Sequence, residues 1–214
     1  MSMFGSMPRV APALILGLGI GANLGLSGCQ CYSRNEAPSA PQQEPKMHDK
    51  KPAISYAFNS IRTGGQTGVD RAALDVASNL QIPFAGWIPA GRGAEDGPIS
   101  SKYEGLIETP SADVNQRTEW NVRDSDGTLV VSVGKPKDGT NWTIEACKIH
   151  NKPYIQFDLS AAPTAAQMDE FKKWIKDHKI QSLNVAGPRE SHRPGFVYSE
   201  SAKWLTQLFN ACCT

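Results

Sequence analysis

The chain has 214 residues, which is room for one ordinary domain and little more. Its 22 Lys and Arg residues against 21 Asp and Glu give a formal charge of +1, which argues against a nucleic-acid binder with a basic surface and against an acidic, disordered chain. Hydrophobic residues make up 40%, enough for a core, and five irregularly spaced Cys residues predict neither a disulfide framework nor a metal site.

The N-terminal part of the chain is typical of a targeting signal. An uncharged, Gly-rich apolar run over 10–26 is at the short limit for a membrane span. It ends in the tetrapeptide LSGC, which resembles the bacterial lipobox. We therefore expect a lipoprotein signal peptide over 1–28, lipidation of Cys29, and a membrane-anchored protein in the periplasm or at the cell surface. The alternatives are a plain secretory signal, an uncleaved anchor, or a translation start at Met47 that leaves the protein cytoplasmic.

The next segment, 29–52, is polar and contains four prolines, which is typical of a disordered tether. We exclude it from the fold and expect one folded domain over 53–214.

Within that domain, strand patterns alternate with helix patterns. Strands are predicted over the alternating run 54–58 and over four further runs, namely Phe84–Ile88, 128–133, Tyr154–Asp158 and Ser182–Ala186. Helices are predicted over 69–80, from a cap at Ser111 to about 124, over 140–150, after a Thr164/Gln167 capping box, and at the C-terminus, where Ala202, Leu205, Leu208 and Phe209 form an apolar stripe. This order implies right-handed crossovers and a doubly wound α/β fold with a mainly parallel sheet of five or more strands.

Four loops follow strands and carry glycine with polar residues: 63–68, 89–98, 134–143 and 187–195. Ligands of open parallel sheets bind outside the carboxyl ends of the strands. We therefore expect these loops to form one site.

The first of these loops has the properties of an anion-binding turn, because glycines let the backbone approach an oxyanion at a helix N-terminus. Its residues are Thr63, Gly64, Gly65, Gln66, Thr67 and Gly68. The alternative is a tight strand-to-helix turn that needs a positive φ. The loop 134–143 is a second candidate of the same kind, with Lys135, Lys137, Gly139, Thr140 and Thr143.

Charged residues extend the candidate site. Arg92 lies between two glycines, where its guanidinium can clamp a phosphate, and Arg117 is a second candidate for which a surface ion pair is equally expected. Carboxylates available for ribose hydroxyls or acid–base work are Glu95, Asp96, Glu119, Asp124, Asp126 and Glu190. Arg189, Glu190 and Ser191 form a polar cluster directly after a strand.

Four stretches, in this order along the chain, resemble the molybdenum-carrier-like family. They are TGGQTGVDRAALD at 63–75, GWIPAGRGAEDGPI at 86–99, the stretch 109–128, and LNVAGPRES at 183–191. This family is similar to a circularly permuted, YpsA-like branch of the SLOG superfamily, whose Rossmann-like domains bind nucleotide-type ligands. The resemblance covers about 54–211. It implies a Rossmann-like fold and a phosphate-bearing ligand, either the molybdenum cofactor or a nucleotide.

One departure separates two functions. Related phosphoribohydrolases carry a PGGxGTxxE motif whose Glu takes part in glycosidic-bond cleavage. The closest stretch here, 137–143, keeps Gly139 and Thr140 but has Thr143 at the Glu position. A hydroxyl can bind phosphate but is no carboxylate acid or base near neutral pH. We therefore predict a binding protein, carrier or sensor rather than an enzyme. The alternative is a nucleotide N-glycoside phosphoribohydrolase that uses Glu95, Asp96, Glu119 or Glu190 instead.

The sequence thus predicts a phosphate on the loop Gly64–Gly68, helped by Arg92, Arg117, Gly139, Thr140 and Thr143. Glu95, Asp96 and the segment Arg189, Glu190 and Ser191 are expected to orient the rest of the ligand. We expect a small phosphate-bearing partner, no nucleic acid, and membrane contact only through the lipid anchor. The sequence is compatible with a homo-oligomer as well as with a monomer.

Overall fold

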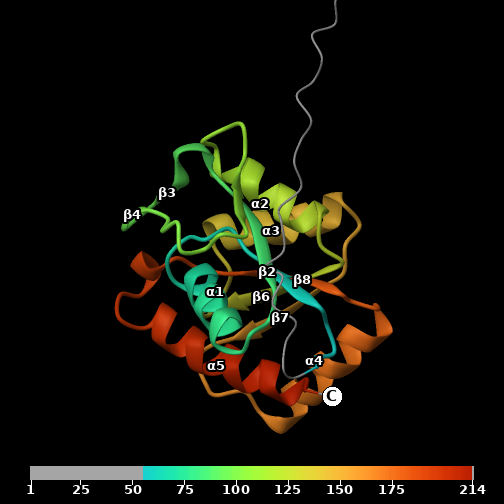
Figure 1. Cartoon of the computed structure of the whole chain (residues 1–214). Coiled ribbons are helices and arrows are strands. Elements are labelled where there is room, and N and C mark those ends of the chain that lie inside the picture. The colour runs from blue at the N-terminus through green and yellow to red at the C-terminus, as the bar shows by residue number, and fades with distance from the viewer. Residues whose placement is uncertain (1–54, 214) are drawn as a thin grey trace, which may run out of the picture. The chain divides into compact units, whose positions relative to one another are not determined.

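The computed structural model describes residues 55–213 (Figure 1). The predicted signal peptide, the tether and Cys29 lie outside the described residues. Among the helices within 55–213, none is both long enough and apolar enough to span a bilayer.

A six-stranded sheet, parallel throughout, runs through the domain in the order β5-β2-β1-β8-β6-β7. Its strands are β1 (Ser60–Arg62), β2 (Phe84–Ile88), β5 (Leu106–Glu108), β6 (Gly127–Ser132), β7 (Tyr154–Asp158) and β8 (Ser182–Ala186). A separate antiparallel hairpin consists of β3 (Gly93–Ala94) and β4 (Gly97–Pro98). The prediction of a mainly parallel sheet with five or more strands is confirmed.

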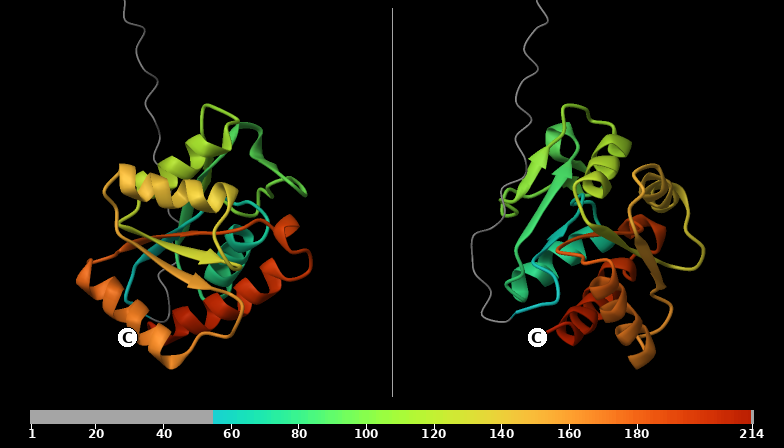
Figure 2. Two further views of the ribbon diagram at one scale, coloured as in Figure 1. Left: turned by 180° about the vertical axis from the view of Figure 1, so that it is seen from behind. Right: turned by 90° about the vertical axis from the view of Figure 1, so that its right-hand side faces the viewer.

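Helices cover both faces of the sheet (Figure 2). On one face α1 (Val69–Asn79) packs against α5 (Val197–Ala211), which also contacts α4 (Ala165–Asp177). On the other face α2 (Val114–Arg123) packs against α3 (Asp138–Ile149). The crossover through α1 and the crossover through α3 run in opposite directions across the sheet, so right-handed connections place these two helices on opposite faces. The fold is therefore doubly wound and Rossmann-like, in a single α/β domain.

The first strand begins later than its hydrophobic alternation predicts. Only Ser60–Arg62 pairs with β2 and β8, whereas the prediction was 54–58. Tyr56 and Phe58 are nevertheless buried, and the ring of Phe58 lies 5.3 Å from that of Phe209 on α5. The backbone of Tyr56 bridges Cys213 in the antiparallel sense, outside the main sheet. The alternation therefore reports burial against the C-terminal helix rather than a strand of this sheet.

Element ends differ from the prediction in smaller ways. The cap of α2 is Asp113, whose carboxylate accepts the N–H of Asn115 at 2.9 Å. Ser111, the predicted cap, instead accepts the N–H of Asp113 at 3.0 Å. The capping box of Thr164 and Gln167 at the start of α4 is confirmed.

The last strand of the chain occupies the middle of the sheet. β8 lies between β1 and β6, and the helices that follow β1 and β6 lie on opposite faces. A doubly wound sheet opens a crevice at such a point, outside the carboxyl ends of the strands.

Candidate functional site

A cleft with a volume of about 90 Å³ opens at the carboxyl ends of β1, β6 and β8. We call it the switch-point cleft. Three of the four predicted loops meet in it, together with the start of α2. Its polar lining residues are Gln66, Asp70, Asn115, Arg117, Thr118, Ser132, Lys135, Lys137, Asp138, Thr140, Thr143, Arg189 and His192.

The switch-point cleft carries an excess of positive charge. Lys135, Lys137 and Arg189 line it, and none of them forms a salt bridge with another residue of 55–213. Arg117 is the exception, because it is paired with Asp70. Unpaired cations that converge on one cleft favour an anionic ligand.

The N-terminus of α3 opens into the same cleft. Its cap residue, Lys137, forms no side-chain capping bond, and a Cβ atom placed on Gly139 would meet nothing within 4 Å. The Thr140 side chain faces the cleft although the residue is only 5% exposed, and no described residue hydrogen-bonds to its hydroxyl. The Thr143 hydroxyl, by contrast, donates to the carbonyl of Gly139 at 3.1 Å. The Thr140 and Asn141 N–H groups already donate to the Lys137 carbonyl at 3.0 and 3.4 Å, so the open donors are the Asp138 and Gly139 N–H groups and the Thr140 hydroxyl. Such donors at a helix start are typical of an anion site.

The glycine-rich loop after β1 uses part of its N–H groups within the protein. The Gln66 N–H donates to Asp70 at 3.3 Å, and the Thr67 N–H donates to the Gln66 side-chain oxygen at 3.0 Å. The Val69 N–H, at the start of α1, donates to the carbonyl of Pro188 at 3.2 Å. The N–H groups of Gly64, Gly65 and Gly68 have no partner among the described residues, and phosphate binding by this loop stays a prediction.

The packing and the backbone conformation of that loop require glycine at three positions. A Cβ atom on Gly64 would lie 1.7 Å from Nη1 of Arg117, and one on Gly68 would lie 2.5 Å from the carbonyl of Pro188. Gly65 has a φ of +71°, a conformation that side chains disfavour. These contacts and this φ are what the tight-turn alternative expects of the loop.

A buried ion pair lies directly against Gly64. Nη1 of Arg117, from α2, lies 3.0 Å from Oδ2 of Asp70, on α1. The Asp70 side chain is 4% exposed; burial raises its pKa, although Arg117 and the Gln66 N–H act in the opposite direction. Because both side chains line the switch-point cleft, the pair fixes the guanidinium there. Arg117 was predicted for the site, whereas Asp70 was not.

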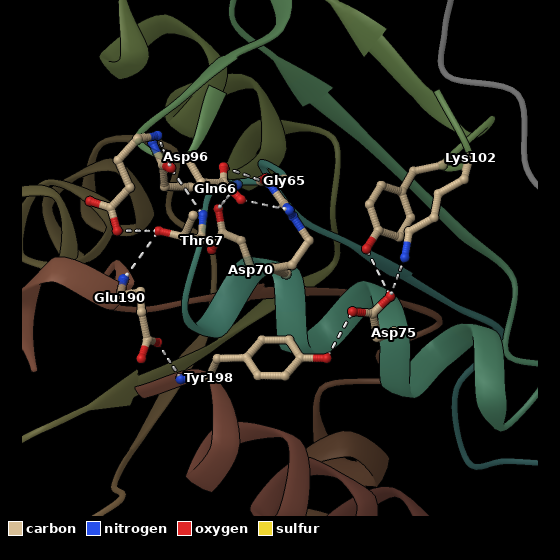
Figure 3. A network of polar contacts seen from close by, with 12 residues as sticks. Gly65, Gln66, Thr67, Asp70, Asp75, Asp96, Lys102, Glu190 and Tyr198 are labelled. Carbon is tan, nitrogen blue, oxygen red and sulfur yellow. Dashed lines mark hydrogen bonds and ion pairs between the residues drawn. The ribbon is translucent and has the colours of Figure 1, made fainter. Parts of the chain in front are cut away.

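The tip of the β3–β4 hairpin is clamped outside this cleft. The Glu95 carboxylate accepts the Thr67 hydroxyl, the Ser191 N–H at 2.9 Å and the Ser191 hydroxyl at 2.7 Å. Burial opposes ionisation of Glu95, but hydrogen bonds from Thr67 and Ser191 outweigh it and hold the Glu95 pKa below its usual value. Figure 3 shows Thr67 at the centre of these contacts, with the Glu190 N–H donating to its hydroxyl at 3.2 Å. We call this cluster the Glu95 clamp.

Two further predicted carboxylates also have structural partners. Asp96 forms a salt bridge with Arg71 at 3.2 Å. Glu190 accepts the Tyr198 N–H at 2.6 Å and thereby caps the start of α5 (Figure 3). Neither lines the switch-point cleft.

Arg92 and Glu119 lie away from the cleft as well. The Arg92 guanidinium donates to the carbonyls of Ile99 at 2.9 Å and Ser100 at 3.1 Å, so it ties its own loop together. Glu119 lies 3.0 Å from Nε2 of His150. The structure therefore brings six predicted site residues into one cleft, namely Gln66, Arg117, Gly139, Thr140, Thr143 and Arg189. A second recess is lined by six others, namely Thr67, Gly68, Glu95, Asp96, Glu190 and Ser191, whereas Arg92 and Glu119 line neither.

A second, more open recess of about 950 Å³ adjoins the Glu95 clamp. Asp75 accepts the hydroxyls of Tyr103 at 2.7 Å and Tyr198 at 2.9 Å, and Lys102 lies 3.2 Å from it (Figure 3). Burial raises the pKa of Tyr103 to about 12, so this hydroxyl stays a donor at neutral pH. The network ties α1 to α5. Within 55–213 no group of three or more His, Cys, Asp or Glu residues is arranged to hold a metal ion.

Residues 61–209 match the model of the circularly permutated YpsA SLOG family. The chain belongs to that family. Among solved structures, it is similar to a crystal structure from Syntrophus aciditrophicus SB described as a "putative molybdenum carrier protein". Identity is 41% and the TM-score 0.67, over 75% of this chain and 98% of that chain. No curated protein matches. The resemblance inferred from the four motifs is confirmed.

In this YpsA-like SLOG domain the four motif stretches have two different roles. The stretches 63–75, 109–128 and 183–191 each contribute to the switch-point cleft, through Asp70, Arg117 and Arg189 respectively. The stretch 86–99 contributes none of its lining residues and forms the clamped hairpin instead.

Proposed function

We propose that this SLOG-family protein binds a phosphate-bearing small molecule, with the phosphate in the switch-point cleft at the N-terminus of α3. The observation that carries the proposal is the Thr140 side chain, which is only 5% exposed, lines the cleft and has a hydroxyl without a partner among the described residues. This hydroxyl is free to donate to a ligand oxyanion.

Charge supports the same assignment. A helix N-terminus carries about half a positive charge, and Lys135, Lys137 and Arg189 add three side-chain cations that no described carboxylate neutralises by a salt bridge. A volume of about 90 Å³ suits a phosphate-sized group, so the organic part of the ligand extends toward the cleft mouth, where Val114 is exposed.

The relative from Syntrophus points to a carrier role, and the family name points to ligand binding. We infer a carrier or sensor for a compound such as the molybdenum cofactor or a nucleotide. For the cofactor, the side chains that fit are those that would hold its phosphate: Lys135, Lys137, Thr140 and Arg189.

Binding is favoured over N-glycoside hydrolysis by the positions of the carboxylates. Glu95, Asp96, Glu119 and Glu190 all lie outside the switch-point cleft, and the position of the hydrolase Glu holds Thr143. Of the two carboxylates that line the cleft, Asp70 is ion-paired with Arg117, and Asp138 is exposed at the start of α3.

The test compares two isosteric substitutions, Thr140→Val and Thr143→Val. Methyl phosphate serves as the probe, because it contains the phosphate without the unidentified organic part, and binding is followed by NMR shifts of the α3 amides. Thr140→Val is expected to weaken binding about tenfold or more, since hydrogen bonds to charged groups contribute roughly 1.5–3 kcal/mol. Thr143→Val is expected to have a smaller effect, because that hydroxyl already donates to Gly139. Unchanged affinity in Thr140→Val would place the phosphate elsewhere.

A further inference from the structure

We propose that the switch-point cleft selects a terminal phosphate monoester, which is close to a dianion at neutral pH, over a phosphodiester, which is a monoanion. The inference rests on the proposed function and names the chemical class of ligand that the same site takes. The charges around the cleft and the donors that face it carry the argument.

The charge inventory comes from every element around the cleft. Permanent cations are Arg117 from α2, Lys135 and Lys137 from the β6–α3 loop, and Arg189 after β8. The carboxylates are Asp70 on α1 and Asp138 at the start of α3, and His192 is an additional titratable group. Without His192, the lining residues therefore carry an excess of two positive charges.

This excess attracts a doubly charged phosphate more strongly than a singly charged one. Asp70 offsets Arg117 at 3.0 Å, and the other lining charges are Lys135, Lys137 and Arg189 against Asp138. Arg189 also interacts with Glu95 outside the cleft, which reduces the excess without cancelling it. A phosphate group with one ester bond carries about −1.5 to −2 at pH 7, and its second pKa is about 6. A diester cannot acquire the second charge, so its attraction to the cations of the cleft is weaker.

The number of charged oxygens acts in the same direction. A second ester substituent would replace one of the three charged oxygens that can accept from the start of α3 and from the Thr140 hydroxyl. Both the charge and the number of acceptors therefore disfavour a diester.

The experiment compares methyl phosphate with dimethyl phosphate, which differ by one methyl group and one charge. Binding to the protein is measured by NMR titration at pH 7.5 and at pH 5.0. At pH 7.5 methyl phosphate is expected to bind about tenfold or more tightly. At pH 5.0 the difference in affinity between the two probes should be smaller, because methyl phosphate is then mostly a monoanion. A His192→Asn protein is measured in parallel, so that the comparison of the two probes is also made without this imidazole.

Two charge variants provide matched controls. Lys137→Gln removes one cation and should narrow the preference for methyl phosphate at pH 7.5. Asp138→Asn removes one carboxylate and should widen it; Asp138 has a φ of +46°, a conformation that Asn tolerates well. Opposite shifts in these two proteins would show that charge, rather than a change in fold, sets the preference.

Equal affinity for the two probes at pH 7.5, or a preference that does not change between pH 7.5 and pH 5.0, would overturn the inference while leaving the proposed function intact. Binding of neither probe would overturn both. Tighter binding of dimethyl phosphate would contradict the inference and indicate a site built for a bridging phosphate.

Discussion

Gly64 and Arg117 share one region of space, and this explains a glycine that sequence reasoning assigned to phosphate binding. The missing Cβ of Gly64 leaves room for Nη1 of Arg117, which reaches the buried carboxylate of Asp70. The glycine therefore serves an ion pair between two helices, α1 and α2. Its effect on a ligand is indirect, through the position of the guanidinium in the switch-point cleft.

Gly64→Ala is accordingly expected to destabilise the domain. The new methyl group displaces the Arg117 guanidinium and leaves Asp70 buried without its partner, which costs about 3–5 kcal/mol when a buried pair is broken. Urea unfolding measures the loss. Gly139→Ala is the matched control, because the space around Gly139 is open and the helix position tolerates Ala.

The Asp70→Asn background tests the physical reason. Residue 70 then carries no charge that could be left buried without a partner. Gly64→Ala should therefore lower the free energy of unfolding markedly less in this background than in the natural protein. Equal costs in both backgrounds would mean that Gly64 acts through backbone conformation and not through the ion pair.

At this scale the sequence predicts some side chains of the cleft and misses others for a definite reason. Thr140 and Arg189 line the cleft as expected, because a Gly-Thr pair at a helix start and an Arg directly after a strand are local patterns. Asp70 was not predicted, since its partner lies 47 residues away on another helix and no local pattern reports such a pair. Arg92 lies outside the cleft because its guanidinium donates to carbonyls of its own loop, and its role in ligand binding stays a prediction.

Among the elements, the β3–β4 hairpin depends on the ionisation of Glu95. Hydrogen bonds in the Glu95 clamp hold the Glu95 pKa below its usual value, despite burial. A carboxylate with a lowered pKa in the folded state contributes stability above its unfolded pKa and loses it as pH falls through the folded pKa. We therefore expect the clamp to be intact at neutral pH and to open in acid, below about pH 4.5.

Hydrogen exchange at the Ser191 amide measures this opening, because that amide donates to Glu95 at 2.9 Å. Glu95→Gln should remove the pH dependence of its protection and lower protection at pH 7. Asp96→Asn is the control at the same hairpin tip, since it removes the Arg71 salt bridge but leaves the clamp. Loss of Ser191 protection in both variants alike would show that the whole hairpin, rather than Glu95, holds the segment.

The elements also show what a sequence pattern can and cannot predict. Helices with a buried stripe, and the strands β2, β7 and β8, were predicted within a few residues because local periodicity reports them. The alternation before β1 came from side chains buried against α5, and backbone pairing with the sheet starts only at Ser60. The edge strand β5 is three residues long, too short for a period of two to stand out.

For the whole molecule, the lipoprotein assignment stays a prediction that the sequence alone supports. The LSGC tetrapeptide after an apolar run predicts that wild-type protein fractionates with the membrane, whereas Cys29→Ser protein is released in soluble form or stays unprocessed. Fractionation measures where the protein is found, and an intact mass measurement detects the mass that the lipid adds.

Cys31→Ser is the matched control, because it removes a neighbouring thiol and leaves the lipobox-like tetrapeptide unchanged. A soluble wild-type protein that begins at Met47 would contradict the assignment and favour the cytoplasmic alternative.

The central position of β8 in the sheet has a consequence for folding during synthesis. A ribosome delivers β1, β2 and β5 first and then β6 and β7, yet the two groups share no strand pairing until β8 is inserted between them. Until about residue 186 has emerged, both groups expose an unpaired inner edge, the kind of surface that recruits other chains. Completion of this sheet is therefore a late, long-range event. A nascent chain that stalls before β8 has been synthesised exposes two unpaired strand edges that can pair with other chains.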